Sequence, residues 1–445
     1  MIKTRRRIAA ALAVVPLAVA PPAAAIVPPT VDDTHLPQPA PPAPAQPTEQ
    51  RGPCFGSTGH AADGTGSGPA MEEVWRLTRG AGQTVAVVDT GVTRHRLLPH
   101  LVGGGDYVSD GDGTTDCDGH GTIVAGIIGA APHAAGFGGV APDATILSIR
   151  QSSNKFAIRG ESLGVGDVRT LAGAVRTAAD LGATVINISS VACVPAADAL
   201  DDRALGAALA YAVDVKNVVV VSAAGNVGGP GGCPEQNPAP DPAGAGGPNW
   251  TDVRSVASPA WYDDLVLCVG SVGPDGVASR FSLGGPWVDV AAPGERIVSL
   301  HPDGEGLIDT AAGEKPISGT SYAAPAVAGL AALVRSRFPR LSAREVMRRI
   351  ETTAHRPPGG WDPFVGNGVV DALAAVSGGS APVAAPAQVK RTVSATPAAS
   401  IDPQPTRVAF GGVAVCLAAT VLAVIMLSTR RIQRRSPNGE PIPDD

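Results

Sequence analysis

The stretch Ile317-Ser318-Gly319-Thr320-Ser321-Tyr322-Ala323-Ala324-Pro325 carries a serine from a turn of small residues to the start of an apolar run at 326–334. We expect that run to form a buried helix. Backbone N–H groups at a helix N-terminus lack partners within the helix and carry partial positive charge, so an oxyanion is favoured there. Pro325 is expected in the first turn, where a proline costs no hydrogen bond. Ser321 is therefore either a nucleophile beside an anion site or a helix cap, a role that serine often fills.

The rest of the chain predicts the domain around this turn. Short apolar runs predict strands at 84–92, 144–150, 184–190, 218–223 and 265–269. Helical patterns occupy 123–128, 167–181, 204–213 and 341–350. Strands that alternate with helices predict an α/β domain with a mostly parallel sheet buried on both faces. Catalytic and ligand-binding groups of such domains lie beyond the C-terminal ends of the strands.

Three further polar residues stand at the ends of these elements. Asp89 lies at the end of the first apolar run, His120 precedes the apolar run at 123–128, and Asn226 follows the strand at 218–223. Each alone has an ordinary explanation, as a turn aspartate, a structural histidine or a turn asparagine. Together with Ser321, they supply the groups that serine acyl transfer needs.

Those groups have complementary roles in acyl transfer. A serine hydroxyl is a weak nucleophile until a base takes its proton, and a histidine can act as that base near neutral pH. An aspartate fixes the histidine tautomer and stabilises the imidazolium. An asparagine amide can donate to the oxyanion of the tetrahedral intermediate, an effect of roughly 3 kcal/mol. The chain order Asp89, His120, Ser321 is the order found in subtilisin.

The two ends of the chain predict export and anchoring. Residues 1–25 have a basic start, an apolar centre and a small-residue end, as a secretory signal peptide does. A first membrane helix is the alternative, but the apolar run is short for that. Residues 408–427 are 20 uncharged residues within a predicted transmembrane helix at 407–429. Four arginines in the following tail, 430–445, place that end in the cytoplasm, so the main domain is expected outside the membrane.

Two segments connect these ends to the main domain, which we expect at 71–377. Residues 26–70 form a proline-rich N-terminal arm, predicted to be extended and without a core of its own. Residues 378–406 are rich in alanine and proline and are interpreted as a spacer. The arm contains Cys54, which suggests that it is stapled to the domain.

The cysteines and the charge exclude several other classes of protein. Cys416 lies in the predicted span, and none of the other five cysteines forms a C-x-x-C pair, so a zinc site has little support. Two disulfides and one free thiol are expected outside the cell, with Cys268 in a buried strand as the free one. A net charge of −6 without a basic stripe gives no support for nucleic-acid binding. The acidic glycine loop at 109–113 is interpreted as a solvated turn, and we expect neither a metal nor a cofactor.

Four ordered motifs resemble those of the subtilisin family. They are Val87-Val88-Asp89-Thr90-Gly91-Val92, Asp118-Gly119-His120-Gly121-Thr122, Ala223-Ala224-Gly225-Asn226 and Gly319-Thr320-Ser321-Tyr322-Ala323-Ala324-Pro325. The resemblance covers about 71–376 and implies a three-layer subtilisin-like fold. It also implies that Asp89, His120 and Ser321 form the triad. Asn226 and the backbone N–H of Ser321 would then form the oxyanion hole.

The resemblance extends to the substrate strand and to the whole architecture. Ile188, Ser189 and Ser190 match the strand that pairs with an extended substrate by β-augmentation. Signal peptide, cysteine-bearing arm, protease domain, spacer, single helix and basic tail together resemble a mycosin, the membrane-anchored protease of type VII secretion systems. That resemblance implies the disulfides Cys54–Cys117 and Cys193–Cys233. The arm is too short and too rich in proline for a folded inhibitory prodomain.

Three functional hypotheses follow from these features. The first is an endopeptidase that cuts extended peptide segments of secreted proteins at the cell membrane. The second is a structural component of the membrane secretion complex, with cleavage secondary or absent. The third is a general extracytoplasmic subtilase. Four intact catalytic positions argue against a pseudoenzyme but leave a dual role open.

Overall fold

The computed structural model describes residues 26–56, 68–133, 136–161, 164–198, 200–229, 231–239, 247–311 and 315–378. The predicted signal peptide, transmembrane helix and cytoplasmic tail lie outside these residues, as does the spacer after its first residue. Within the described ranges, no helix is both long enough and apolar enough to cross a membrane.

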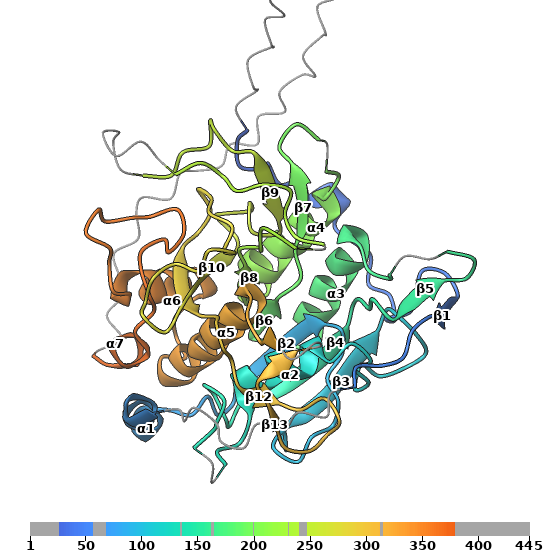
Figure 1. Ribbon diagram of the computed structural model, residues 1–445, viewed down its shortest axis with the longest axis horizontal. Helices are drawn as coiled ribbons and strands as arrows, with labels where there is room; N and C mark the ends of the chain where they lie inside the picture. The colour runs from blue at the N-terminus through green and yellow to red at the C-terminus, as the bar shows by residue number, and fades with distance from the viewer. Residues whose placement is uncertain are drawn as a thin grey trace, which may run out of the picture. The chain divides into compact units, whose positions relative to one another are not determined.

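A seven-stranded sheet forms the centre of the domain, with strand order β11-β10-β8-β6-β2-β4-β3 (Figure 1). Every neighbouring pair in this sheet is parallel, which confirms the mostly parallel α/β fold predicted from the sequence. In chain order its strands are β2 (Thr84–Asp89), β3 (Leu101–Asp106), β4 (Thr145–Arg150), β6 (Val185–Ile188), β8 (Val219–Ala223), β10 (Leu267–Val272) and β11 (Val290–Pro293).

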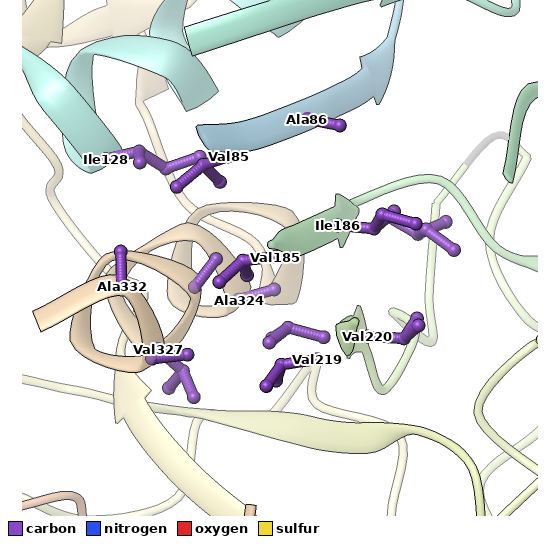
Figure 2. Packing of buried hydrophobic residues seen from close by; sticks show 14 of the residues in the cluster. Val85, Ala86, Ile128, Val185, Ile186, Val219, Val220, Ala324, Val327 and Ala332 are labelled. Carbon is purple, nitrogen blue, oxygen red and sulfur yellow. The ribbon is translucent and has the colours of Figure 1, made fainter. Parts of the chain in front are cut away.

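Helices cover both faces of the sheet. The helices are α1 (Gly68–Leu77), α2 (His120–Gly129), α3 (Val168–Asp180), α4 (Arg203–Ala210), α5 (Thr320–Arg337), α6 (Ala343–Thr353) and α7 (Ala372–Val376). A π-helical turn, η2 (Tyr211–Val215), continues α4. Because successive side chains of a strand point to opposite faces, apolar strands need a helix on each side. Figure 2 shows this alternation. The side chains on the α5 side are Val85, Val185 and Val219, and the residue that follows each of them points away from α5, namely Ala86, Ile186 and Val220.

Local sequence explains where two of the helices begin. Asp167 accepts a hydrogen bond from the backbone of Thr170 and so caps α3, while Ser342 and Glu345 form the same reciprocal capping box at α6. Both helices start within two residues of their predicted positions.

Strand β3 was not predicted, because three consecutive glycines, 103–105, have low strand propensity. The packing explains why glycine is present. A Cβ on Gly105, whose φ is +123°, would lie 2.3 Å from Pro42 of the N-terminal arm. The arm therefore packs directly on this edge strand.

The arm is extended and fastened to the domain, as predicted. It contains the short 3-10 turn η1 (Asp33–His35) and the strand β1 (Thr48–Gln50), which pairs antiparallel with β5 (Phe156–Ile158), as Figure 1 shows. The disulfide Cys54–Cys117 then joins the arm to the loop before α2. Three further antiparallel pairs lie outside the main sheet: β7 (Ala192–Pro195) with β9 (Ser255–Ser258), β12 (Ser299–Leu300) with β13 (Leu307–Ile308), and β14 (Thr310–Ala311) with β15 (Lys315–Pro316).

Candidate active site

The four polar residues predicted from the sequence come from elements that meet at the C-terminal ends of the central strands. Asp89 is the last residue of β2, and Asn226 follows β8 by three residues. Strand β6 lies between these two strands. His120 is the first residue of α2 and Ser321 the second residue of α5, and the two helices pack against each other.

The side chains of His120 and Asp89 form a hydrogen bond. Their Nδ1 and Oδ1 atoms are 2.7 Å apart, and the backbone N–H of Thr90 donates to the same Oδ1 at 2.8 Å. Asp89 is fully buried, whereas about a quarter (26%) of the His120 side chain is exposed. With Nδ1 used as a donor, Nε2 is left as the basic nitrogen.

The electrostatic surroundings favour the charged form of His120. Burial alone would lower the pKa of the imidazole, but the negative charge and hydrogen bond of Asp89 raise it, and Asp116 and Asp118 add to the rise. The net result is a pKa above the ordinary 6.5.

Asp116 connects the two segments that carry Asp89 and His120, and the sequence analysis did not single it out. Its buried carboxylate accepts from the Thr90 hydroxyl at 2.8 Å, from the Gly119 N–H at 2.8 Å, and from the N–H and hydroxyl of Thr122 at 2.8 and 2.7 Å. Burial raises its pKa to about 6 in spite of these bonds. An aspartate just before an apolar helix is the signal that could have identified this capping role.

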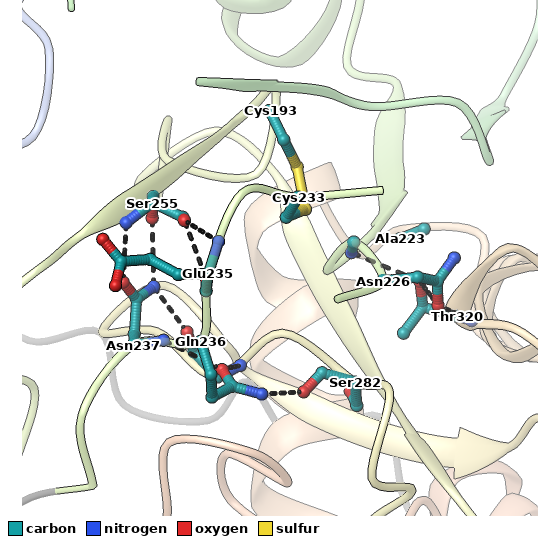
Figure 3. Close-up of a disulfide and its surroundings, with 12 residues drawn as sticks. Cys193, Ala223, Asn226, Cys233, Glu235, Gln236, Asn237, Ser255, Ser282 and Thr320 are labelled. Carbon is teal, nitrogen blue, oxygen red and sulfur yellow. Dashed lines mark hydrogen bonds between the residues drawn. A yellow bond between two sulfur atoms is a disulfide. The ribbon is translucent and has the colours of Figure 1, made fainter. Parts of the chain in front are cut away.

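The cap of α5 differs from the prediction. Gly319 is the N-cap residue and has no side chain to offer, so Ser321 is not a helix cap. Asn226, 94 positions away, fills that role, because its Oδ1 accepts from the N–H of Thr320 at 3.0 Å and from the Thr320 hydroxyl at 3.1 Å. Figure 3 shows this contact. The amide NH₂ group of Asn226 remains available as a donor at the helix N-terminus.

Pro325 also differs from the prediction, since it is the sixth residue of α5 rather than part of the first turn. A proline there cannot donate to the carbonyl four residues earlier, which belongs to Ser321. The hydroxyl of Ser189 donates to that carbonyl instead, at 2.8 Å.

The three predicted substrate-binding residues differ in their surroundings. Ile188 ends β6 and is fully buried, and Ser189 is 3% exposed with its hydroxyl directed at Ser321. Ser190 is partly exposed. Of the three side chains, that of Ser190 is therefore the one open to an incoming ligand.

Tyr322 contacts the histidine from the serine side, a role that the sequence analysis did not assign. Its ring centroid lies 5.2 Å from that of His120, with the planes tilted by 44°. Burial raises the pKa of its hydroxyl, and the charges of Asp89 and Asp116 add to this. Tyr322 thus places the first turn of α5 against the imidazole.

Both disulfides implied by the resemblance are present, and each lies next to a predicted catalytic segment. Cys54–Cys117 precedes His120, and Phe55 donates its N–H to the Cys117 carbonyl at 2.6 Å. Figure 3 shows the disulfide Cys193–Cys233. It packs on Gly225, where a Cβ would lie 2.8 Å from the Cys233 sulfur. The Cys233 N–H donates to the Asn226 carbonyl at 2.7 Å.

Cys268 is buried and free, as predicted, and burial raises its pKa far above the usual range. Among the described residues, no group of three or more His, Cys, Asp or Glu side chains could hold a metal ion.

Comparison with known proteins identifies the family. The sequence profile of the Subtilase family, Peptidase_S8, matches residues 80–368. Mycosin-4 of Mycobacterium tuberculosis is 57% identical over 439 residues, which span 94% of each chain. The crystal structure of MycP1 from Mycobacterium smegmatis superposes with a TM-score of 0.74 at 43% identity, over 82% of this chain and 99% of that one.

A second solved structure is similar over more of the chain. A chain of an intact ESX-5 inner membrane complex has a TM-score of 0.73 at 40% identity, and covers 91% of this chain and 100% of its own. The family profile, the identity to Mycosin-4 and the shared fold agree. This chain is a subtilisin-like serine protease that belongs to the subtilase family and, within it, to the mycosins.

Proposed function

We propose that the protein is a membrane-anchored serine endopeptidase with Asp89, His120 and Ser321 as its catalytic triad. The observation that carries this proposal is the 2.7 Å contact between His120 Nδ1 and Asp89 Oδ1, which leaves Nε2 as the base. Nε2 takes the proton of the Ser321 hydroxyl as its oxygen attacks the scissile carbonyl, and later gives that proton to the leaving amine.

Asn226 and the N-terminus of α5 stabilise the oxyanion in this mechanism. The Asn226 Oδ1 is occupied by Thr320, so its NH₂ group is the part that can donate to the developing charge. The Ser321 N–H in the first turn of α5 is the second donor. Because the helix N-terminus also carries partial positive charge, both contributions act on the same oxygen.

An extended peptide is the substrate best suited to the C-terminal end of the sheet, where β6 ends. We propose that Ser189 and Ser190, which follow β6, pair with it through their backbone, so that main-chain hydrogen bonds provide affinity without fixing the sequence. The prediction that Ile188 also pairs with the substrate is not kept, because Ile188 is already aligned with Val88 on one side and Ser222 on the other within the sheet. The partial exposure of Ser190 supports this placement.

A fluorophosphonate probe tests the triad directly, because it reacts with an activated serine and needs no knowledge of the substrate. The detergent-solubilised wild-type protein is expected to label at Ser321, and Ser321→Ala to remain unlabelled. The variant Ser318→Ala, in the same loop, is the matched control and should label like the wild type. Equal labelling of wild type and Ser321→Ala would overturn the assignment.

The proposed setting is a type VII secretion system. Two solved relatives are described as MycP1 from the ESX-1 type VII secretion system and as a component of the periplasmic assembly of the ESX-5 inner membrane complex. We propose that residues 1–25 direct export, that 407–429 anchor the protein, and that its substrates are secreted proteins of that system. Secreted proteins from cells with wild-type protein or Ser321→Ala should then differ in their cleaved termini.

A structural role in the secretion complex is the second candidate, because a similar chain occurs in the intact ESX-5 inner membrane complex. Native gels of membranes separate the two functions. If the structural role holds, the complex persists in Ser321→Ala cells and is lost when the gene is deleted. A general extracytoplasmic subtilase, the third hypothesis, would leave the complex intact in both strains.

A further inference from the structure

We infer that Ser189 is a positioning residue for the nucleophile, acting through the backbone carbonyl of Ser321. This inference rests on the proposed role of Ser321. It starts from the proline at the sixth position of α5, which removes the N–H that would otherwise bind that carbonyl. The carbonyl lies in the first turn of the helix, on the residue whose hydroxyl must attack.

The Ser189 hydroxyl supplies the missing donor at 2.8 Å. Its direction is set from the other side, because the same oxygen accepts from the side-chain amide of Asn187 at 2.9 Å. Because the Ser189 oxygen accepts the Asn187 amide N–H, its own hydroxyl proton is left to point toward the Ser321 carbonyl. Asn187 therefore donates to Ser189, and Ser189 donates to the Ser321 carbonyl, which accepts.

Burial makes this relay a fixed part of the fold. Asn187 is fully buried in β6 and Ser189 is 3% exposed, so solvent does not compete for either group. Strand β6 lies at the centre of the sheet between β8 and β2. The relay therefore ties the first turn of α5 to the end of β6, because Ser189 directly follows that strand and Asn187 lies within it.

The consequence is specific to the reacting serine. The proposed mechanism uses both the hydroxyl and the N–H of Ser321, and both move if the first turn of α5 relaxes. A small displacement of reacting groups lowers the rate by up to about 100-fold without weakening substrate binding. A residue that only lined the substrate strand would instead change KM.

A double-mutant cycle between Ser189 and Pro325 tests the inference, because Pro325→Ala restores the backbone N–H that the helix lacks. For Ser189→Ala alone, kcat against a peptide substrate should fall about 10- to 100-fold with KM unchanged. For Pro325→Ala alone, kcat should stay close to that of the wild type. The double variant should recover to within about threefold of Pro325→Ala, since the new N–H takes over the bond.

Two controls separate positioning from loss of stability. Ser148→Ala removes a buried hydroxyl of β4, which donates to the Gly113 carbonyl at 2.6 Å, and should lower the melting temperature without lowering kcat. Ser189→Thr keeps a hydroxyl and should retain more activity than Ser189→Ala at equal stability.

Three outcomes would overturn the inference: unchanged kcat in Ser189→Ala, a change confined to KM, or additive losses in the double variant. Full activity in Ser321→Ala would instead overturn the proposed function. The two failures are therefore distinguishable in the same set of variants.

Discussion

The side-chain oxygen of Asn226 accepts the backbone N–H of Thr320 at 3.0 Å and so caps the serine helix. The NH₂ group of the same amide is the part that we propose donates to the oxyanion. The two roles use different atoms of one amide and can therefore be separated by mutation. An aspartate keeps the accepting oxygen and replaces the donating nitrogen.

We predict that Asn226→Asp lowers kcat by about 10²- to 10³-fold, because it removes an oxyanion donor. Its melting temperature should stay at or above that of the wild type, since a carboxylate still caps α5 and a negative charge suits a helix N-terminus. Steady-state kinetics and thermal unfolding measure the two effects. Asn226→Ala is the matched variant and should lose both. Wild-type turnover in Asn226→Asp would show that the amide nitrogen is not used.

The pH dependence should follow His120. Its pKa lies above the ordinary 6.5, because the charge and hydrogen bond of Asp89 outweigh burial. The base must be neutral, so kcat/KM should fall as the pH drops through that raised value. Asp118→Asn removes one of the charges that raise the pKa of His120, so the acidic limb of kcat/KM should move to lower pH.

Asp110→Asn is the control for this shift, because it removes the same charge from an exposed loop position. Its pH profile of kcat/KM should coincide with that of the wild type. A limb that moves to higher pH in Asp118→Asn would contradict the assignment of His120 as the base.

Local patterns predicted the catalytic segments because each one follows or begins an apolar element. Asp89 ends a β-branched run, and His120 precedes an apolar helix, so their positions at the sheet edge could be inferred from the chain itself. The cap of α5 could not, because Asn226 is 94 positions away from Thr320. The same holds for Gly105, because Pro42 of the distant arm fills the space that a Cβ at this position would need.

The geometry around the serine was partly misjudged for a related reason. Helix periodicity predicted the buried part of α5 but not its first residue, so Pro325 was placed one turn too early in the helix. The disulfide pairings came from the resemblance, because cysteine spacing alone permits several connectivities.

Three carboxyl groups with raised pKa values, those of Asp263, Asp289 and Glu351, should make stability depend on pH. Burial and the neighbouring charges of Asp264 and Glu351 raise the pKa of Asp263 to about 6, and burial also raises the pKa values of Asp289 and Glu351. A folded-state pKa above the unfolded value means that the folded protein binds more protons. Stability is therefore full below about pH 4 and is lost as the pH rises through about 6.

We predict that Asp263→Asn raises the free energy of unfolding at pH 8 by roughly 1 kcal/mol and leaves it nearly unchanged at pH 4. Urea unfolding at the two pH values measures this difference. Glu72→Gln, at an exposed position on α1, is the control and should show no such contrast. A stabilisation that is larger at pH 4 than at pH 8 would contradict the sign.

The two disulfides should affect different properties, because they hold different segments. Removing Cys54–Cys117 with a double serine variant should release the arm after β1 and expose it to limited proteolysis. The bond closes a separation of 63 residues, so its loss should cost up to about 4 kcal/mol in the chain-entropy description. Removing Cys193–Cys233 in the same way should mainly lower kcat, because that bond packs on Gly225 and the Cys233 N–H binds the Asn226 carbonyl.

Peptide mapping after brief protease treatment, together with kinetics on the same samples, distinguishes these outcomes. Cys268→Ser is the control for replacing a cysteine with serine without breaking a disulfide, since that thiol is unpaired and lies in the same buried cluster as Cys233. The arm should stay protected in Cys268→Ser and in the variant that lacks Cys193–Cys233. If the arm stays equally protected without Cys54–Cys117, the pairing of β1 with β5 is sufficient to hold it, and the disulfide is not the main attachment.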